Sequence, residues 1–198
     1  MRVIVGISGT TGPIYGIRLL EVLKKKKIES HLIITPAAEK IIPMETPYSI
    51  KDVKSLAYKS YGNDDLSAAI SSGSFKTDGM VVIPCSIKSL SGIANSYNEN
   101  LLIRASDVTL KERRRLVLVV RETPLHQGHF ELMLQASRAG AIFLPPMPAF
   151  YFRPKTIDDL INHTVGKVLD LFGIENDLFE RWGNSTAGKP QKRRSSRY

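Results

Sequence analysis

Residues 2–20, RVIVGISGTTGPIYGIRLL, decide the fold. The stretch begins with an apolar run rich in β-branched residues, which predicts a strand buried on both faces of a parallel sheet. Glycines and hydroxyl residues follow, and Pro13 then opens a helical pattern. A strand, a glycine-rich turn and a helix N-terminus form an anion site, because N–H groups and the helix dipole attract a phosphate.

The glycine spacing distinguishes this turn from a dinucleotide site. Gly6, Gly9 and Gly12 give the spacing GxxGxxG, whereas the dinucleotide pattern is GxGxxG. Hydroxyl side chains occupy the gaps, so the pattern favours a mononucleotide phosphate held by serine and threonine as well as by glycine. An ordinary strand–helix turn is the alternative that these residues leave open.

The composition is that of one globular α/β domain, with 198 residues of which 42% are hydrophobic and 24% charged. No apolar run approaches the ~20 residues that span a bilayer, and we identify no secretory signal at the N-terminus. A single cysteine, Cys85, excludes an intramolecular disulfide and fits the reducing cytoplasm, where we expect the protein.

The net charge of +9 depends strongly on the C-terminal tail. Residues 183–198 contain five basic residues and no acidic one, and the other 182 residues carry +4. The tail is also rich in Gly, Ser and Pro, so we expect a domain over residues 1–182 and a basic disordered tail over 183–198. Weak contact with RNA is one use of such a tail. A solvated appendage is the favoured interpretation, and we expect no specific nucleic-acid partner.

The rest of the chain alternates apolar strands with helical patterns. Strands are predicted at residues 3–7, 30–35, 79–84, 116–120 and 141–144, and the main helices at 36–42, 86–94, 100–114, 128–139 and 157–172. Met44-Glu45-Thr46, between two prolines, is predicted as a turn, and residues 48–74 as a loop with short helical pieces. The alternation predicts a single-domain flavodoxin-like or Rossmann-like parallel sheet with helices on both faces.

Ligands of such sheets bind beyond the carboxyl ends of the strands, so the residues that follow each strand are the candidates. After the third strand, Ser86 can cap the next helix, and Lys88 and Ser89 stand in its first turn. These polar side chains exceed what a cap requires and favour a second contact with a ligand. Cys85 has no charged base beside it in the sequence and is predicted to be a core residue rather than a nucleophile.

Arg121 and Glu122 follow the fourth strand. A buried charge there would need a partner or a ligand. The arginine suits a phosphate or a flavin carbonyl, and the glutamate can accept a proton or hold Lys111. An Arg–Glu–Lys network without chemistry is the alternative. His126 and His129 lack further metal ligands nearby in the sequence, so no metal site is expected.

The segment LPPMPAFYFRP, residues 144–154, is unusually apolar for a loop. Aromatic side chains fixed by proline can form the wall of a dry pocket for an isoprenoid or a ring system. They can equally form a contact between subunits, and the two uses are compatible.

Four motifs, in this order and spacing, resemble the UbiX-type flavin prenyltransferases, long described as aromatic-acid decarboxylases of the homo-oligomeric flavoprotein family. They are GISGTTGPIYGIRLL, IPCSIKSLSGIAN, DVTLKERRRLVLVVRETPL and PPMPAFYFRP. The resemblance extends over residues 2–173 and leaves the tail outside.

The resemblance implies a metal-independent transferase that moves a dimethylallyl group from dimethylallyl phosphate to N5 and C6 of reduced FMN. The product, prenylated FMN, would serve a separate UbiD-type decarboxylase, and the enzyme would be a homo-oligomer, expected to be a dodecamer. An FMN-dependent decarboxylase of the phosphopantothenoylcysteine type is the rival enzyme, although we find no motifs for its acid-handling histidine and substrate clamp. A non-catalytic flavin-binding carrier is the rival from another class.

The resemblance also assigns roles to residues by position. FMN-binding positions are Gly9, Thr10, Thr11, Thr35, Ser86, Ile87, Lys88, Ser89 and Arg121; positions that bind dimethylallyl phosphate are Lys111, Glu122, Tyr151 and Lys167. Thr11 stands where the family commonly has serine, and it keeps the hydroxyl for proton handling. Lys167 replaces the usual arginine, so it keeps the charge and loses the bidentate geometry. Glu45 matches an acid linked to the ring-closing proton transfer, and the choice between Glu45 and Glu122 for that step is left open.

Overall fold

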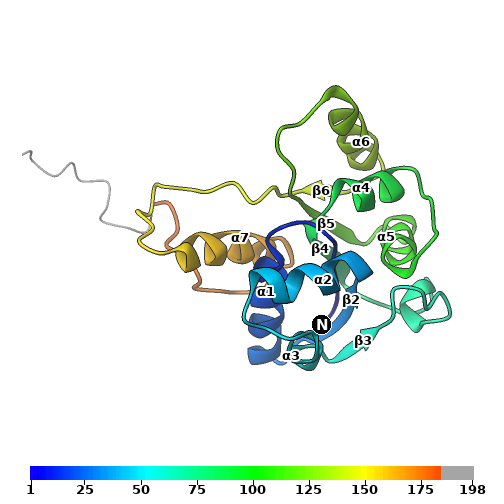
Figure 1. Cartoon of the computed structure of the whole chain (residues 1–198), viewed down its shortest axis with the longest axis horizontal. Coiled ribbons are helices and arrows are strands. Elements are labelled where there is room, and N and C mark those ends of the chain that lie inside the picture. The colour runs from blue at the N-terminus through cyan, green and yellow to red at the C-terminus, as the bar shows by residue number, and fades with distance from the viewer. Residues whose placement is uncertain (184–198) are drawn as a thin grey trace, which may run out of the picture.

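The computed structural model describes residues 1–183, in which six parallel strands form one sheet in the order β3-β2-β1-β4-β5-β6 (Figure 1). The strands are β1 (Arg2–Ile7), β2 (Glu29–Ile34), β3 (Lys59–Tyr61), β4 (Gly79–Cys85), β5 (Arg115–Val120) and β6 (Ile142–Phe143). All neighbouring pairs are parallel. The predicted α/β fold with a parallel sheet is therefore confirmed.

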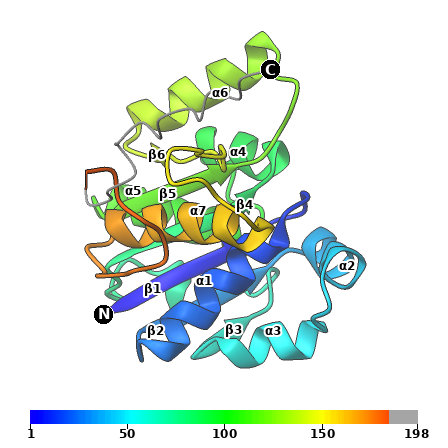
Figure 2. The ribbon, with the colours of Figure 1, turned by 90° about the vertical axis from the view of Figure 1, so that its left-hand side faces the viewer.

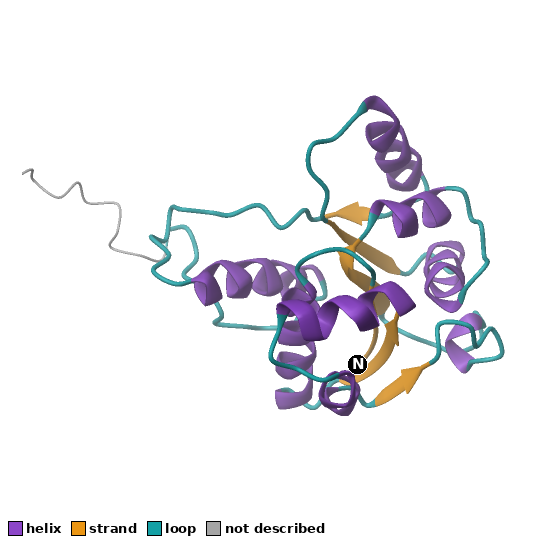
Figure 3. Ribbon diagram, viewed as in Figure 1, coloured by secondary structure: helices purple, strands orange, loops and turns teal. Residues whose placement is uncertain are grey.

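Helices cover both faces of the sheet, as Figures 2 and 3 show. They are α1 (Pro13–Lys25), α2 (Pro36–Glu45), α3 (Ile50–Leu56), α4 (Ile87–Ala94), α5 (Leu101–Lys111), α6 (Gln127–Arg138) and α7 (Ile157–Leu171), with a 3₁₀ turn at Ala69–Ser71. Buried residues of α1, α3 and α7 share one core cluster with the sheet, and those of α4, α5 and α6 share another. The sheet thus separates two apolar cores.

Each central strand contributes to both cores because successive side chains point to opposite faces. In β1, Val5 and Ile7 belong to the cluster beneath α1, whereas Ile4 belongs to the cluster beneath α5. Gly16 lets α1 approach the sheet closely, since a Cβ there would collide with the carbonyl oxygen of Ile83. These contacts explain why the central strands are continuously apolar in the sequence.

The expectation of five strands was wrong, because a sixth, β3, lies within the segment predicted as a loop. Residues 48–74 also contain α3 and the 3₁₀ turn. β3 has three residues, Lys-Ser-Tyr, and pairs with β2 at the edge of the sheet. A strand this short and polar has too few positions to show an apolar period, and pairing with β2 supplies the order that the local sequence lacks.

The turn predicted at residues 44–46 was also wrong, because α2 continues through Pro43 to Glu45. A proline inside a helix removes one N–H donor and crowds the preceding turn. Here Pro43 lies in the last turn, and beyond it the N–H of Thr46 still reaches the carbonyl of Ile42 at 3.0 Å. The destabilising effect of the proline is confined to the end of the helix. Glu45 therefore lies on a helix rather than in a turn.

Within residues 1–183, no helix combines the length and the apolar character needed to cross a membrane. The predicted tail at residues 183–198 lies outside the described residues except for Gly183.

Candidate functional site

A cavity of about 290 Å³ lies at the carboxyl edge of the sheet, where the strand ends meet three helix N-termini. Thr35, Ser86 and Asn100 are the N-cap residues of α2, α4 and α5. The lining residues are Gly9, Thr35, Pro36, Ala37, Asn63, Ser86, Lys88, Ser89, Asn100 and Ile103. Helix N-termini and the Lys88 ammonium both favour an anion, so this cavity suits a phosphate-bearing ligand.

The hydroxyl groups that line the cavity take part in capping the adjacent helices and still have hydrogen-bonding positions available. Thr35 Oγ1 accepts from the N–H of Ala38 at 3.3 Å. Ser86 Oγ accepts from the N–H of Ser89 at 3.3 Å and donates to Ser89 Oγ at 3.2 Å. A hydroxyl carries one donor and two acceptor positions. Thr35 and Ser89 therefore each retain a donor for a ligand.

The β1–α1 turn is packed too closely for a side chain at Gly9. A Cβ there would collide with the Cβ of Ala37 at the start of α2. The buried Ser8 ties the same turn to the β4–α4 turn, since its Oγ donates to the carbonyl of Pro84 at 2.9 Å and accepts from the N–H of Ser86 at 2.7 Å. The two turns form one rigid wall of the cavity.

Thr11 and Glu45, both predicted to handle protons, contact each other beside this wall. Thr11 Oγ1 donates to Glu45 Oε2 at 3.0 Å, and the N–H of Gly12 donates to the same oxygen at 2.9 Å. Gly12 is the N-cap of α1 with φ +91°, a conformation that glycine adopts without strain. The carboxylate is thus held at the N-terminus of α1, where the helix dipole favours a negative charge.

Arg121 lies on the same rim, beyond β5. Its N–H donates to the carbonyl of Cys85 at 3.1 Å, and its own carbonyl accepts from Thr10 Oγ1 at 3.2 Å. Burial raises the pKa of Tyr15 on α1, and the positive charge of Arg121 opposes part of that rise. Glu122 is exposed and accepts from the N–H of Thr123 at 3.0 Å.

The Arg–Glu–Lys network considered from the sequence is not formed within the chain, because Lys111 forms an ion pair with Glu112 instead. Lys111 ends α5 beside Gly73, at the amino edge of the sheet. A strand of six residues separates the two edges by roughly 20 Å. Lys111 therefore does not reach the cavity of its own chain.

Tyr151 and Lys167 are also absent from the lining of the cavity, and Lys167 lies on α7, which packs against α1. Tyr151 packs edge-on against Phe152 and Trp182, and its hydroxyl lies 3.4 Å from Nε2 of His163 on α7. Lys167 stands on α7 one turn after His163, and it contributes, after burial, to the lowered pKa of that histidine. These two predicted phosphate ligands form a cluster of their own with His163.

The remaining residues singled out from the sequence do not line the cavity. Cys85 is fully buried, and burial raises the pKa of its thiol to about 12, which confirms a core residue. The side chain of Ile87 packs partly buried against the core and does not line the cavity. His126 caps α6 through Nδ1, which accepts from the N–H of Gly128 at 3.1 Å. In the part of the chain that the structure describes, no group of three or more potential metal ligands occurs.

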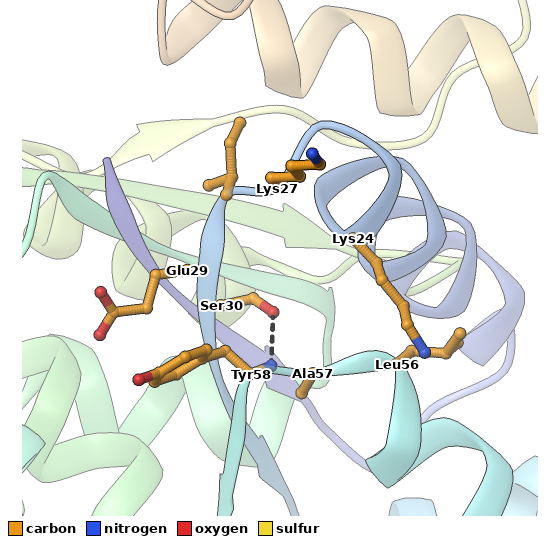
Figure 4. A pocket seen from close by; sticks show the side chains of 8 residues that line it. Lys24, Lys27, Glu29, Ser30, Leu56, Ala57 and Tyr58 are labelled. Atoms are coloured by element: carbon orange, nitrogen blue, oxygen red, sulfur yellow. Dashed lines mark hydrogen bonds between the residues drawn. The ribbon is translucent and has the colours of Figure 1, made fainter.

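Figure 4 shows another cavity, of about 440 Å³, at the amino edge of the sheet between α1, β2 and α3. Several of its polar groups are engaged within the chain. Ser30 Oγ accepts from the N–H of Tyr58 at 3.3 Å, and Lys24 Nζ donates to the carbonyl of Ser55 at 2.9 Å. No predicted site residue lines it, so the carboxyl-edge cavity remains the candidate site.

Sequence reasoning missed five lining residues, namely Pro36, Ala37, Asn63, Asn100 and Ile103. Asn63 closes the cavity from the long 48–74 segment: its Oδ1 accepts from the N–H of Leu102 at 3.2 Å. The length of that segment was the available signal, since long segments between strands often carry function. Asn100 also had a signal, because it stands in an N-cap position before a helical pattern.

The fold and the site together define a class: an α/β protein with a mononucleotide-type binding site at the carboxyl edge of a parallel sheet. We call the cavity lined by Gly9, Thr35, Lys88 and their neighbours the phosphate cradle. Comparison with known proteins specifies the class further. The family model described as Flavoprotein matches residues 1–168. Flavin prenyltransferase UbiX of Thauera aromatica is 57% identical over 182 residues, which cover 92% of this chain and 94% of that protein.

Two crystal structures have the same fold at high identity. AnUbiX (PadA1), in complex with FMN and dimethylallyl pyrophosphate, has a TM-score of 0.91 and 46% identity, covering 93% of this chain and 98% of that one. A dodecameric FMN-dependent UbiX-like decarboxylase from Escherichia coli O157:H7 has a TM-score of 0.90 and 51% identity, covering 92% and 99%. The chain belongs to the Flavoprotein family and, within it, to the UbiX-type flavin prenyltransferases.

Proposed function

We propose that this protein transfers a dimethylallyl group from dimethylallyl phosphate to N5 and C6 of reduced FMN. The observation that carries the proposal is the Thr11–Glu45 contact beside a phosphate cradle. A carrier of flavin needs the cradle alone, whereas ring closure on a flavin also needs a group that takes a proton. High identity to proteins named flavin prenyltransferase supports the same reaction.

The residues of the cradle fit FMN. Three helix N-termini, Lys88 and the hydroxyls of Thr35 and Ser89 offer donors to a phosphate, and Gly9 lets the β1–α1 turn pack against Ala37, where a side chain would collide. We assign Thr10, Thr11, Ser86, Ile87 and Arg121 to the same binding site. Reduced FMN supplies the electron-rich N5 and C6 atoms; the protein supplies position, charge and exclusion of water.

The phosphate of the second substrate requires cations as the allylic C–O bond breaks, because negative charge grows on the departing group. We assign the stabilisation of that charge to the ammonium groups of Lys111 and Lys167 and to the hydroxyl of Tyr151, and we place Glu122 in the same binding site. Since Lys111 and the Tyr151–Lys167 cluster lie away from the cradle of their own chain, we infer that neighbouring subunits complete each site. The dodecameric neighbour from E. coli O157:H7 supports a homo-oligomer, which we propose to be a dodecamer.

The proton released on ring closure would go to Glu45 or to Glu122. Glu45 Oε2 is preorganised by two donors, the Thr11 hydroxyl and the Gly12 N–H. Thr11 Oγ1 can pass a proton to this oxygen because the two are in hydrogen-bond contact. We therefore assign the proton to Glu45, with Thr11 as its relay.

The product would leave for a UbiD-type decarboxylase, and the single cysteine supports a location in the cytoplasm. Separate anaerobic incubations distinguish this function from its rivals. With reduced FMN and dimethylallyl phosphate, the prenyltransferase gives a modified flavin, and a carrier returns FMN unchanged. With oxidised FMN and phosphopantothenoylcysteine, release of CO₂ without any modified flavin would favour the rival decarboxylase.

A further inference from the structure

Asp170 of α7 holds a basic residue from beyond the helix and lies near a second one on the helix itself. Arg181 binds it in a bidentate manner, with Nη1 2.8 Å from Oδ2 and Nη2 2.7 Å from Oδ1. Asn176 Nδ2 donates to Oδ1 at 3.0 Å. Lys167 Nζ stands 4.0 Å from Oδ2, at the outer limit of an ion pair. Oδ2 is therefore the oxygen for which Arg181 and Lys167 compete.

Arg181 binds the Asp170 carboxylate more tightly than Lys167 does. A planar guanidinium matches a carboxylate with two parallel hydrogen bonds, whereas an ammonium on a flexible stem acts as a point charge. The Arg181 hydrogen bonds are also the largest cause of the lowered pKa of Asp170, ahead of the charge of Lys167. Lys167 is left with 51% of its side chain exposed and its ammonium available to another anion.

We propose that Arg181 is a positioning residue that occupies Asp170 and so leaves Lys167 available for the phosphate of dimethylallyl phosphate. The inference rests on the proposed function, in which Lys167 is a phosphate ligand. Without Arg181, Oδ2 would lose its partner at 2.8 Å and the ammonium three residues earlier would close onto it. Lys167 and Asp170 face each other because residues three apart on a helix are neighbours.

A purely structural role is the competing explanation. The segment after α7 folds back over the helix, where Gly166 makes room for the ring of Phe179, and Arg181 lies over that ring at 5.1 Å. Phe179 packs on His163, the residue that contacts Tyr151. Loss of Arg181 could therefore loosen this cluster. The two explanations differ in one respect: only competition for Asp170 is relieved by removing the carboxylate.

Four variants of the full-length protein separate the explanations: Arg181→Ala, Asp170→Asn, the double variant, and Arg138→Ala as a control that removes the same charge from the exposed end of α6. The first readout is KM for dimethylallyl phosphate and for FMN. The second is the Kd of dimethylallyl phosphate, measured calorimetrically on protein that holds oxidised FMN and does not turn over.

Arg181→Ala should raise both constants for dimethylallyl phosphate by about three- to fivefold, the range of a half-exposed ion pair, and leave KM for FMN unchanged. The double variant should return to the wild-type values. Asp170→Asn and Arg138→Ala should each leave the wild-type values unchanged. Unchanged constants in Arg181→Ala, or a double variant as weak as Arg181→Ala, would overturn the inference. Absence of any prenylated flavin from wild type would instead refute the proposed function, and the Kd series would still decide whether Arg181 controls phosphate binding.

Discussion

Thr11 and Glu45 are separated by 34 positions in the chain, yet the Thr11 hydroxyl donates to Glu45 Oε2 at 3.0 Å. The contact joins the β1–α1 turn to the last turn of α2. It depends on α2 continuing past Pro43, since a helix that ended at the proline would leave Glu45 in a turn without this fixed direction. The proton acceptor that we propose therefore stands on a helix and is fixed by hydrogen bonds from the β1–α1 turn.

Glu45→Gln should bind FMN with unchanged affinity and stall between alkylation at N5 and closure at C6. The amide keeps the shape of the carboxylate and its acceptor oxygen for Thr11, but it does not take up the proton. The open, singly attached product has the same mass as the closed one, so absorption spectra of the extracted flavin would distinguish the two, and mass spectrometry would report the added five-carbon unit. Glu39→Gln on the same helix is the matched control. Normal yields of the closed product from Glu45→Gln would remove this residue from the mechanism.

Gly9→Ala should weaken FMN binding and lower the free energy of unfolding by about 1–3 kcal/mol, the usual cost of overpacking. The added methyl group collides with the Cβ of Ala37. Ala37→Gly removes that partner at a cost of up to about 1 kcal/mol. The double variant Gly9→Ala/Ala37→Gly should thus recover FMN binding. Quenching of flavin fluorescence measures the FMN affinity of each variant. Equal FMN affinity in Gly9→Ala and wild type would show that this close approach does not shape the cradle.

Lys167→Ala should raise KM for dimethylallyl phosphate by roughly tenfold, the value of a hydrogen bond to a charged group, with little change in KM for FMN. Lys167→Arg should lower KM for dimethylallyl phosphate below that of wild type, because a guanidinium can bind the phosphate in a bidentate manner. Steady-state kinetics with each substrate varied in turn would test both. Parallel changes in the two KM values would assign Lys167 a structural role.

His31 should make stability depend on pH. It is buried, with Nδ1 2.8 Å from the hydroxyl of Tyr61 and Nε2 2.8 Å from Oε1 of Glu29. Burial lowers its pKa, although Glu29 opposes the shift. Between the lowered value and the unfolded value of about 6.5, the unfolded chain binds more protons. The stabilising contribution is therefore complete above pH 6.5 and is lost as the pH falls through the folded pKa.

His31→Gln should have a smaller decrease in the free energy of unfolding between pH 7 and pH 5 than wild type has. Urea unfolding of the FMN-bound protein across this range measures the difference. The window stays above the region where Glu29 would contribute, since its own pKa is lowered, chiefly by Arg2. Identical slopes for the two proteins would contradict the assignment to His31.

The sequence predicted those parts of the fold that follow from local pattern. Residues 2–20 and the apolar strands near 79–84 and 116–120 carry their periods within a few positions, and the caps Ser86 and Thr35 are recognisable from residue type and place. β3 was missed because its order comes from pairing with β2, and the end of α2 was missed because tertiary contacts of Glu45 outweigh the local effect of Pro43.

The cradle was predictable in part for the same reason. Its members that follow strands, such as Gly9 and Lys88, were found by the rule that ligands bind at the carboxyl edge. Asn63 was not, because β3, the strand that it follows, was itself not predicted, and Ala37 was not, because its methyl group offers no hydrogen bond to a ligand. The separation of Lys111 from the cradle follows from the topology, since a helix that leads into a parallel strand ends at the amino edge of the sheet, whereas the resemblance assigned the role of Lys111 by position alone.

The most direct test of the central claim is the mass of the flavin after turnover. The purified protein is incubated anaerobically with reduced FMN and dimethylallyl phosphate, alongside a reaction without the phosphate and one with Lys111→Ala. We predict a flavin heavier by one five-carbon unit in the complete reaction, none without the phosphate, and much less with Lys111→Ala. Recovery of unmodified FMN from wild-type protein that has FMN bound would contradict the claim and leave a flavin carrier.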